Sequence, residues 1–302
     1  MVKAIEGIIA PLVTPFDEAG RLDAARAKGE IRRLLDAGVD GISPGGSTGE
    51  GAALTDGELA ELVRLIRAED PEIPVVAGVI RNSTPAAVSA GLAAKEAGAD
   101  ALMVTPVSYN VLVPDDEGNY NFYREISDRV GLPIVIYNVV PQNTITAPLF
   151  GKLLEIENVV GIKQSVGGIM AFYEMKMVNG KRGKVFSATD DMLCSTYELG
   201  ADGAISAILT VFPELCVEMW KDFKEGRREH ALELQNRMYF TWQAIAGSQF
   251  PIRIKYALRL MGRDAGWPRG PICHMGEEEK RRIRGALEEG GFLETVSADK
   301  GE

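Results

Sequence analysis

Short apolar runs alternate with amphipathic segments along most of the chain. Eight of the runs have the length and composition of buried strands; they cover residues 5–13, 41–45, 75–78, 101–105, 134–137, 159–163, 185–188 and 203–206. Between them, apolar residues recur at helical spacing, near residues 21–37, 55–69, 84–97, 119–130, 147–155, 169–178 and 191–199. The pattern therefore predicts a strand and a helix in regular alternation.

A five-residue phrase marks three of the junctions between a helix and the next strand. It reads Ala-Gly-Val-Asp-Gly at 37–41, Ala-Gly-Ala-Asp-Ala at 97–101 and Leu-Gly-Ala-Asp-Gly at 199–203. The glycine suits the left-handed conformation that ends a helix, and the aspartate can hydrogen-bond the turn into the strand. Short helix-to-strand turns of this kind favour parallel strands covered by helices.

The element count predicts an α/β fold, a (β/α)8 TIM barrel formed by residues 1–210. A doubly wound sheet is the alternative, but no Gly-x-Gly-x-x-Gly motif opens a helix after the first strand. Residues 211–302 contain four more helical patterns, near 214–224, 227–246, 251–262 and 277–289. These are too few for an independent fold, so we expect a C-terminal helical extension packed on the barrel or on a neighbouring subunit.

Composition narrows the class of protein. The 302 residues include 33 Lys and Arg against 43 Asp and Glu, a net charge of -10, which argues against a nucleic-acid partner. No apolar run approaches membrane-spanning length, and the first residues lack the pattern of a signal peptide. Cys194, Cys216 and Cys273 are far apart, and there are only two histidines. We expect a cytoplasmic enzyme with no disulfide framework, no metal and no cofactor.

Lys163 ends the apolar run that begins at Val159. Desolvation disfavours the charged form of a lysine, and a neutral lysine can attack a carbonyl carbon to form a Schiff base. The alternative interpretation is a strand-end lysine that extends its ammonium group into water.

Other candidate site residues also lie at or after the ends of predicted strands, and in a barrel these ends meet at the catalytic face. They include Gly46, Ser47 and Thr48 after the second strand, Tyr109 after the fourth, Tyr137 at the end of the fifth, Ser165 after Lys163, Asp190 and Asp191 after the seventh, and Ile205 in the eighth. The glycine-rich turn is not a phosphate-binding P-loop, because no Gly-Lys-Ser/Thr follows; its backbone N–H groups suit a carboxylate. Tyr137 could transfer protons or merely form a structural hydrogen bond.

Four segments resemble the signatures of the dihydrodipicolinate synthase and N-acetylneuraminate lyase family. They are Gly46–Glu50, Tyr137-Asn138, Gly161–Lys163 and Gly203–Ser206, and the resemblance extends from about residue 5 to 290. It implies a class I aldolase or lyase that acts on pyruvate or another 2-keto acid. It also implies a homotetramer built as a dimer of dimers.

The resemblance assigns roles to individual residues. Lys163 would form the Schiff base, and Tyr137 would move protons. Ser47 and Thr48, with the backbone at Gly46, would relay protons and hold the keto-acid carboxylate, and the backbone at Ile205 would lie near that carboxylate. Tyr109 would match a tyrosine that reaches into the site of a partner subunit. Asp190 and Asp191 resemble the acidic pair that binds substrate hydroxyls in sialic-acid lyases.

The chain departs from dihydrodipicolinate synthases where these carry an arginine for the carboxylate of the aldehyde substrate. Here the corresponding loop offers Gln142 and Asn143, which cannot form a charged bidentate pair. Ser165 is polar where the synthases have a small apolar residue. We therefore expect a Schiff-base lyase whose second substrate is polar or hydroxylated. The alternatives are a dihydrodipicolinate synthase that uses aspartate semialdehyde, and a barrel that binds a keto acid without turnover.

Overall fold

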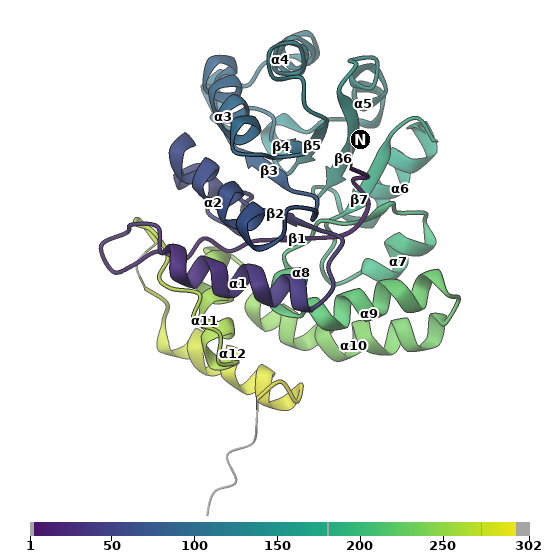
Figure 1. The fold of residues 1–302 in the computed structure, drawn as a ribbon. Coiled ribbons are helices and arrows are strands. Elements are labelled where there is room, and N and C mark those ends of the chain that lie inside the picture. Colours follow the sequence, from purple (N-terminus) through teal and green to yellow (C-terminus); the bar gives the residue numbers. More distant parts are fainter. Residues whose placement is uncertain (1–2, 180, 273, 294–302) are drawn as a thin grey trace, which may run out of the picture.

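Eight parallel strands form the centre of the molecule, seen in a computed structural model that describes residues 3–179, 181–272 and 274–293 (Figure 1). The strands are β1 Gly7–Pro11, β2 Gly41–Ser43, β3 Val76–Val79, β4 Ala101–Val104, β5 Ile134–Asn138, β6 Val159–Gln164, β7 Lys184–Ser187 and β8 Gly203–Ala204. Their order in the sheet is β2-β1-β8-β7-β6-β5-β4-β3, and a parallel bridge between Ile42 and Val75 joins β2 to the residue before β3. The predicted barrel is confirmed.

Alternate residues of each strand face opposite sides of the barrel wall. In β1, Ile9 belongs to the apolar cluster inside the barrel, whereas Ile8 and Ala10 belong to the larger core between strands and helices. All three are fully buried. Because both faces of a parallel barrel strand are covered, these strands read as continuous apolar runs in the sequence.

Seven helices follow the first seven strands and surround them (Figure 1). They are α1 Ala24–Asp36, α2 Asp56–Glu69, α3 Thr84–Glu96, α4 Asp116–Val130, α5 Ala147–Leu153, α6 Gly168–Asn179 and α7 Leu193–Glu198. Local capping explains several of their starts. Thr55 and Glu58 form a capping box at α2, and the side chain of Asp23 accepts two backbone N–H groups at α1.

The recurring Gly–Asp phrase has the geometry expected from the sequence. Its glycines have positive φ angles: 79° at Gly38, 102° at Gly98 and 86° at Gly200. Each aspartate carboxylate accepts a backbone N–H from a neighbouring strand or its first flanking residue: Asp40 from Ile8 at 2.7 Å, Asp100 from Val75 at 2.8 Å and Asp202 from Val185 at 2.8 Å. The same turn thus fastens three helix-to-strand junctions to the bottom of the barrel.

The remaining chain forms helices against one side of the barrel (Figure 1). They are α8 Ile208–Val211, α9 Pro213–Lys224, α10 Arg228–Ile245, α11 Phe250–Leu260 and α12 Glu277–Glu289. The helices α8 and α9 contact β1, and α10 contacts α7, α9, α11 and α12. Short 3-10 turns, η1 Gly51–Ala53, η2 Asn110–Leu112 and η3 Pro141–Asn143, follow β2, β4 and β5. The sequence pattern predicted neither these turns nor α8.

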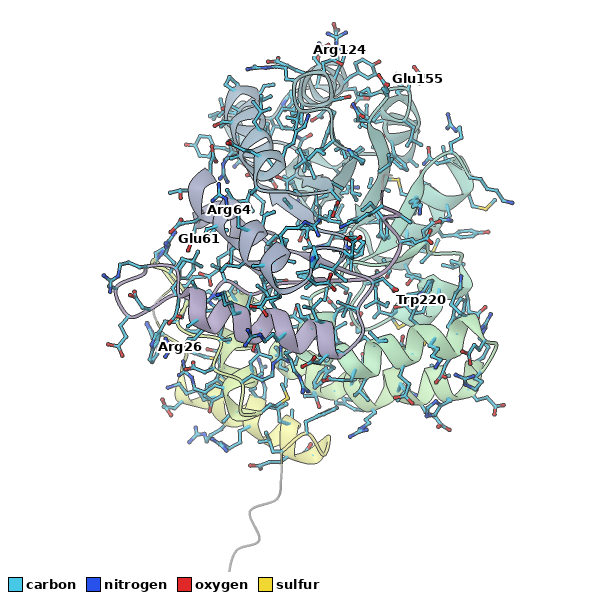
Figure 2. The ribbon with its side chains drawn as sticks, in the orientation of Figure 1. Arg26, Glu61, Arg64, Arg124, Glu155 and Trp220 are labelled. Atoms are coloured by element: carbon cyan, nitrogen blue, oxygen red, sulfur yellow. The ribbon has the colours of Figure 1, made fainter. Side chains whose placement is uncertain are left out.

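Charged side chains stand on the outer faces of the surrounding helices. Glu61 and Arg64 of α2, Arg124 of α4 and Glu155 after α5 are exposed and point outward (Figure 2). Within the part of the chain that the structure describes, no helix combines the length and the apolar character needed to cross a bilayer.

Candidate active site

Lys163 lies near the end of β6, directly beside Tyr137 of β5 in the register of the sheet. Its side chain is only 4% exposed. The Nζ atom lies 3.8 Å from the centre of the Tyr137 ring. Among the described residues, no carboxylate forms a salt bridge with this Nζ and no atom accepts a hydrogen bond from it. A buried lysine without an ion pair is rare in structural roles, which favours a chemical role.

Tyr137 connects Lys163 to the glycine-rich turn after β2. The Tyr137 hydroxyl donates a hydrogen bond of 3.0 Å to Oγ of Ser47. Tyr137 itself is 4% exposed and packs with the apolar residues inside the barrel. The ring is therefore fixed, and its hydroxyl, bonded to Ser47, is placed to exchange a proton with a group bound in the site.

The turn that carries Ser47 and Thr48 is held tightly from within. A Cβ atom at Gly49 would lie 2.6 Å from the carbonyl oxygen of Leu12, and one at Gly51 would lie 1.7 Å from that of Gly45, so only glycine fits at both positions. In the described chain, the backbone N–H groups of Ser47 and Thr48 have no hydrogen-bond acceptor. Two free N–H groups beside two hydroxyls form a binding site suited to a carboxylate.

Asp190 supplies the negative charge of the site. Its Oδ1 accepts hydrogen bonds from Oγ of Ser206 at 2.5 Å and from the N–H of Ile208 at 2.9 Å. Burial raises the pKa of this carboxyl above its usual value, whereas these two bonds and the charge of Lys163 act in the opposite direction. Asp191 turns away from Asp190 and accepts a hydrogen bond of 2.7 Å from Gln243.

These side chains surround a pocket of about 270 Å³. Its lining includes Ser47, Thr48, Tyr137, Lys163, Ser165, Asp190 and Ser206, together with Val139, Ala188, Ala207, Trp242, Ala246, Gly247 and Phe250. The last four come from α10, the following loop and the start of α11, and sequence analysis missed them. Their segments read as helices, but the amphipathic pattern does not say which neighbour a buried face covers.

Four of the predicted site residues do not line this pocket. Tyr109 lies just before η2 and is 60% exposed. Ile205 is fully buried, and its N–H donates to the carbonyl of Ser187 at 2.9 Å. Gly46 contributes its carbonyl to the turn, where it accepts the N–H groups of Gly49 and Gly51, and Asp191 faces α10.

No arginine lines the pocket, whose described charged residues are Lys163 and Asp190. The Gln142 side chain donates to the carbonyl of Ser108, and buried Asn143 donates to that of Val107. Arg81, which follows β3, binds Asp56 at 2.8 Å and the carbonyl of Leu54 at 2.9 Å. Each of these polar side chains is engaged outside the pocket.

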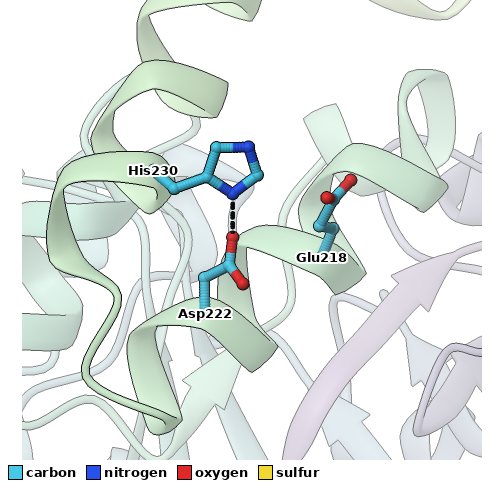
Figure 3. Close-up of side chains that lie close together, drawn as sticks. All are labelled: Glu218, Asp222 and His230. Atoms are coloured by element: carbon cyan, nitrogen blue, oxygen red, sulfur yellow. Dashed lines mark hydrogen bonds and ion pairs between the residues drawn. The ribbon is translucent and has the colours of Figure 1, made fainter.

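One group of potential metal ligands lies elsewhere in the described chain, at Glu218, Asp222 and His230 (Figure 3). Asp222 lies in the last turn of α9 and is buried, and its two oxygens already accept hydrogen bonds from Arg227 and from Nδ1 of His230. A cationic guanidinium on the same carboxylate opposes a metal ion, so we interpret the group as the closure of the α9–α10 hairpin. The buried thiols of Cys194 and Cys216 are free, and Cys273 lies outside the described residues.

Comparison with known proteins identifies the family. The sequence model of the Dihydrodipicolinate synthetase family matches residues 4–290. The chain belongs to this family. It is 34% identical over 296 residues to a 4-hydroxy-tetrahydrodipicolinate synthase of Archaeoglobus fulgidus, which covers 97% of this chain and 99% of that one. A synthase of the same name from Methanothrix thermoacetophila is 32% identical and covers 93% and 95% of the two chains.

Solved structures of the family share the fold. The dihydrodipicolinate synthase of Aquifex aeolicus is 29% identical, with a TM-score of 0.89 over 96% of this chain and 100% of that one. A prophage protein of the family from Escherichia coli K12, solved in complex with pyruvate, is 26% identical, with a TM-score of 0.90 over the same shares. The (β/α)8 barrel and the membership of a family of aldolase-type lyases, both predicted from the sequence, are therefore confirmed. The names of the relatives support the synthase alternative better than the main expectation of a hydroxylated second substrate.

Proposed function

We propose that this protein binds pyruvate and forms a Schiff base between the carbonyl carbon and Nζ of Lys163. The observation that carries the proposal is a buried lysine without an ion pair, placed against a tyrosine whose hydroxyl is bonded to Ser47. A barrel that only binds a keto acid would need neither the lysine nor the proton path, so we favour turnover over simple binding.

The site supports a specific sequence of steps. The free N–H groups of Ser47 and Thr48 bind the carboxylate of the keto acid. The amine of Lys163 attacks the carbonyl carbon to give a carbinolamine, and the Tyr137 hydroxyl delivers a proton to the departing hydroxyl, which leaves as water. The resulting iminium loses a proton from its methyl group to become an enamine. The enamine carbon then bonds to the carbonyl carbon of an aldehyde, the aldehyde oxygen takes up a proton, and the iminium forms again on Lys163. Water adds to this iminium and the C–N bond breaks, which releases the product and the free amine of Lys163.

For the second substrate, the relatives favour aspartate semialdehyde, since those from Archaeoglobus fulgidus and Methanothrix thermoacetophila are named 4-hydroxy-tetrahydrodipicolinate synthases. The reaction would join this aldehyde to the pyruvate enamine in the pocket between Lys163 and the wall formed by Trp242 and Phe250.

A second candidate rests on the charges that line the pocket. Asp190 is the acidic group there, and no arginine is present among the described lining residues. An incoming carboxylate must be desolvated without a guanidinium partner, whereas a hydroxyl can donate to the second oxygen of Asp190. This favours aldol cleavage or dehydration of a hydroxylated 2-keto acid, with Ser165 as a further polar contact.

Steady-state kinetics separate the two candidates. Pyruvate with aspartate semialdehyde tests the synthase reaction, and sugar-derived 2-keto acids test the hydroxylated class. A higher kcat/KM for aspartate semialdehyde would establish the synthase reaction. Activity confined to the sugar acids would establish the second candidate. Inactivity toward both, together with pyruvate binding, would indicate a binding protein.

We also propose that the protein acts as a homo-oligomer, a dimer of dimers, in the cytoplasm. Tyr109, Val111 and Leu112 expose apolar surface around η2, and Met170 and Met177 do so on α6. Two separate exposed apolar patches support two kinds of contact between copies. In such an assembly Tyr109 would enter the site of a partner subunit. Sedimentation analysis of wild type and of a Leu112→Asp variant tests the assembly, because the variant should dissociate by one step.

A further inference from the structure

Lys255 of α11 is a second buried lysine, and it lies outside the pocket that holds Lys163. Its side chain is 2% exposed. The ammonium group donates to three oxygens: the carbonyl of Thr14 at 2.6 Å, Oε1 of Glu50 at 2.6 Å and the carbonyl of Trp267 at 2.7 Å. An ammonium has three protons, so its hydrogen-bonding capacity is fully used. The group is therefore fixed in position and is not available to a ligand.

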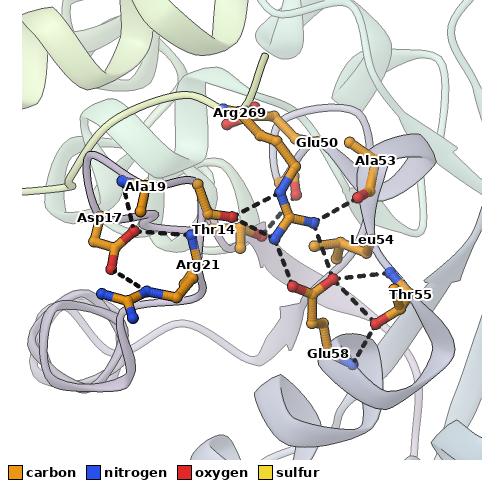
Figure 4. A network of polar contacts seen from close by, with 12 residues as sticks. Thr14, Asp17, Ala19, Arg21, Glu50, Ala53, Leu54, Thr55, Glu58 and Arg269 are labelled. Atoms are coloured by element: carbon orange, nitrogen blue, oxygen red, sulfur yellow. Dashed lines mark hydrogen bonds and ion pairs between the residues drawn. The ribbon is translucent and has the colours of Figure 1, made fainter. Parts of the chain in front are cut away.

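Glu50 is the last residue of the glycine-rich turn, and its side chain is as firmly fixed as that of Lys255. Its side chain is 4% exposed, and its Oε2 accepts the backbone N–H of Arg269 at 2.8 Å (Figure 4). Its backbone has a φ of 55°, a left-handed conformation that is uncommon for a residue with a side chain. The surroundings must hold this conformation, and the two contacts of the carboxylate do so.

Further hydrogen bonds hold the turn between Gly46 and Glu50. The hydroxyl of Thr14 donates to the carbonyl of Gly49 at 2.6 Å, while the carbonyl of Thr14 accepts from Lys255. The N–H of Glu50 donates to the carbonyl of Ser47 at 3.1 Å. One ammonium group thus binds both the end of the turn and the segment after β1 that supports it.

Lys255 does not touch the substrate pocket, but through Glu50 it holds the glycine-rich turn that contributes to that pocket. Ser47 and Thr48 line the substrate pocket, and Ser47 accepts the Tyr137 hydroxyl. Lys255 lines a different cavity, together with Trp267. Phe250 begins the same helix, α11, and lines the substrate pocket itself. The helix α11 therefore joins one wall of the pocket to the turn that carries its hydroxyl groups.

We propose that Lys255 and Glu50 are positioning residues, which set the Ser47 and Thr48 hydroxyl and N–H groups at the distance from Lys163 that imine formation requires. This inference rests on the proposed function and names residues that act in it without touching substrate. The competing explanation is that the pair only attaches α11 to the barrel. A buried ion pair is weak evidence for stability, because removal of both charges is often neutral for folding. The two explanations therefore predict different kinetics.

The experiment compares Glu50→Gln and the double variant Lys255→Met/Glu50→Gln with a matched control, Glu30→Gln. Glu30 of α1 is also a buried carboxylate paired with a cation of the C-terminal region, Arg263, at 2.5 Å, but it does not touch the turn. For each folded variant, the rate of imine formation is measured by rapid quenching with borohydride in the presence of pyruvate. The KM for pyruvate and the thermal midpoint are measured alongside.

We expect imine formation to slow by roughly 10- to 100-fold in both Glu50 variants, with a higher KM for pyruvate, since misplacement of a binding group by about 1 Å can cost this much. Glu30→Gln should lower the thermal midpoint and leave both kinetic quantities unchanged. Wild-type imine formation in a folded Glu50 variant would overturn the inference, and so would an equal slowing in Glu30→Gln. Failure of both Glu50 variants to fold would also overturn it, because the pair would then serve the stability of the barrel. If wild-type protein itself forms no imine, the proposed function fails instead.

Discussion

Removal of one hydroxyl group, in a Tyr137→Phe variant, separates the chemical role of this residue from its packing. The ring stays in the barrel interior, where it is 4% exposed, and only the 3.0 Å bond to Ser47 is lost. A neutral hydrogen bond contributes about 0.5–1.5 kcal/mol to stability. General acid–base catalysis contributes ~10²–10⁴ in rate, which corresponds to roughly 3–5 kcal/mol of activation free energy. We therefore expect a large loss of kcat and a small loss of stability.

The assay is kcat with pyruvate and the best aldehyde, together with urea unfolding. Tyr123→Phe is the matched control, since Tyr123 is fully buried in α4 and its hydroxyl donates a bond of 3.2 Å to the carbonyl of Val104. Both variants should lose a similar amount of stability, whereas only Tyr137→Phe should lose activity. An unchanged kcat in Tyr137→Phe would remove the hydroxyl from the mechanism, and an equal loss in both variants would trace the effect to loosened packing.

Three further predictions follow from the charged and buried groups. A hydrogen bond from Arg269 lowers the pKa of Glu58 to about 2 (Figure 4), so this carboxylate adds stability that is complete above about pH 4.5 and is lost as the pH falls toward 2. Glu58→Gln should therefore lower the free energy of unfolding, measured with urea, by roughly 1–2 kcal/mol at about pH 5 and by much less at about pH 2. Burial raises the pKa of Cys194 to about 11, so iodoacetamide at neutral pH should label it far more slowly in native than in unfolded protein, and fast native labelling would contradict its buried position. Asp190→Asn should raise the KM of hydroxylated 2-keto acids roughly tenfold with no change in pyruvate trapping; equal KM values would show that Asp190 does not bind the hydroxyl.

The barrel, and the position of Lys163 near the end of a buried strand, could be predicted because both follow from local pattern. Each Gly–Asp phrase forms a turn in which the aspartate accepts a hydrogen bond from a neighbouring strand or its flanking residue. Asp40, for example, accepts the N–H of Ile8. The rule that strand ends converge then brings Tyr137 and Ser47 to Lys163 without any knowledge of distance. Their contacts, at 3.0 Å and 3.8 Å, bear out that convergence.

The contribution of the C-terminal helices could not be predicted, because it depends on contacts between residues far apart in the chain. Lys255 reads as one of several cations in an amphipathic helix, and its partner Glu50 lies 205 residues away. The sequence pattern places Trp242 and Phe250 on apolar faces of helices, but it does not say that these faces form the wall of a pocket. Asp190 and its neighbour are adjacent in a turn, where side chains do not alternate regularly, so the pattern cannot say which of them enters the site.

Covalent capture of pyruvate tests the central claim most directly. Wild-type protein is incubated with pyruvate and borohydride, and the modified residue is located by peptide mass spectrometry, with Lys163→Ala treated in parallel. Lys163 is buried beside Tyr137 near the end of β6, and none of the residues that the structure describes forms an ion pair with it. The account predicts one reduced pyruvate adduct, on Lys163, and none in the variant. An adduct on another lysine, or persistent labelling of a folded Lys163→Ala protein, would contradict it.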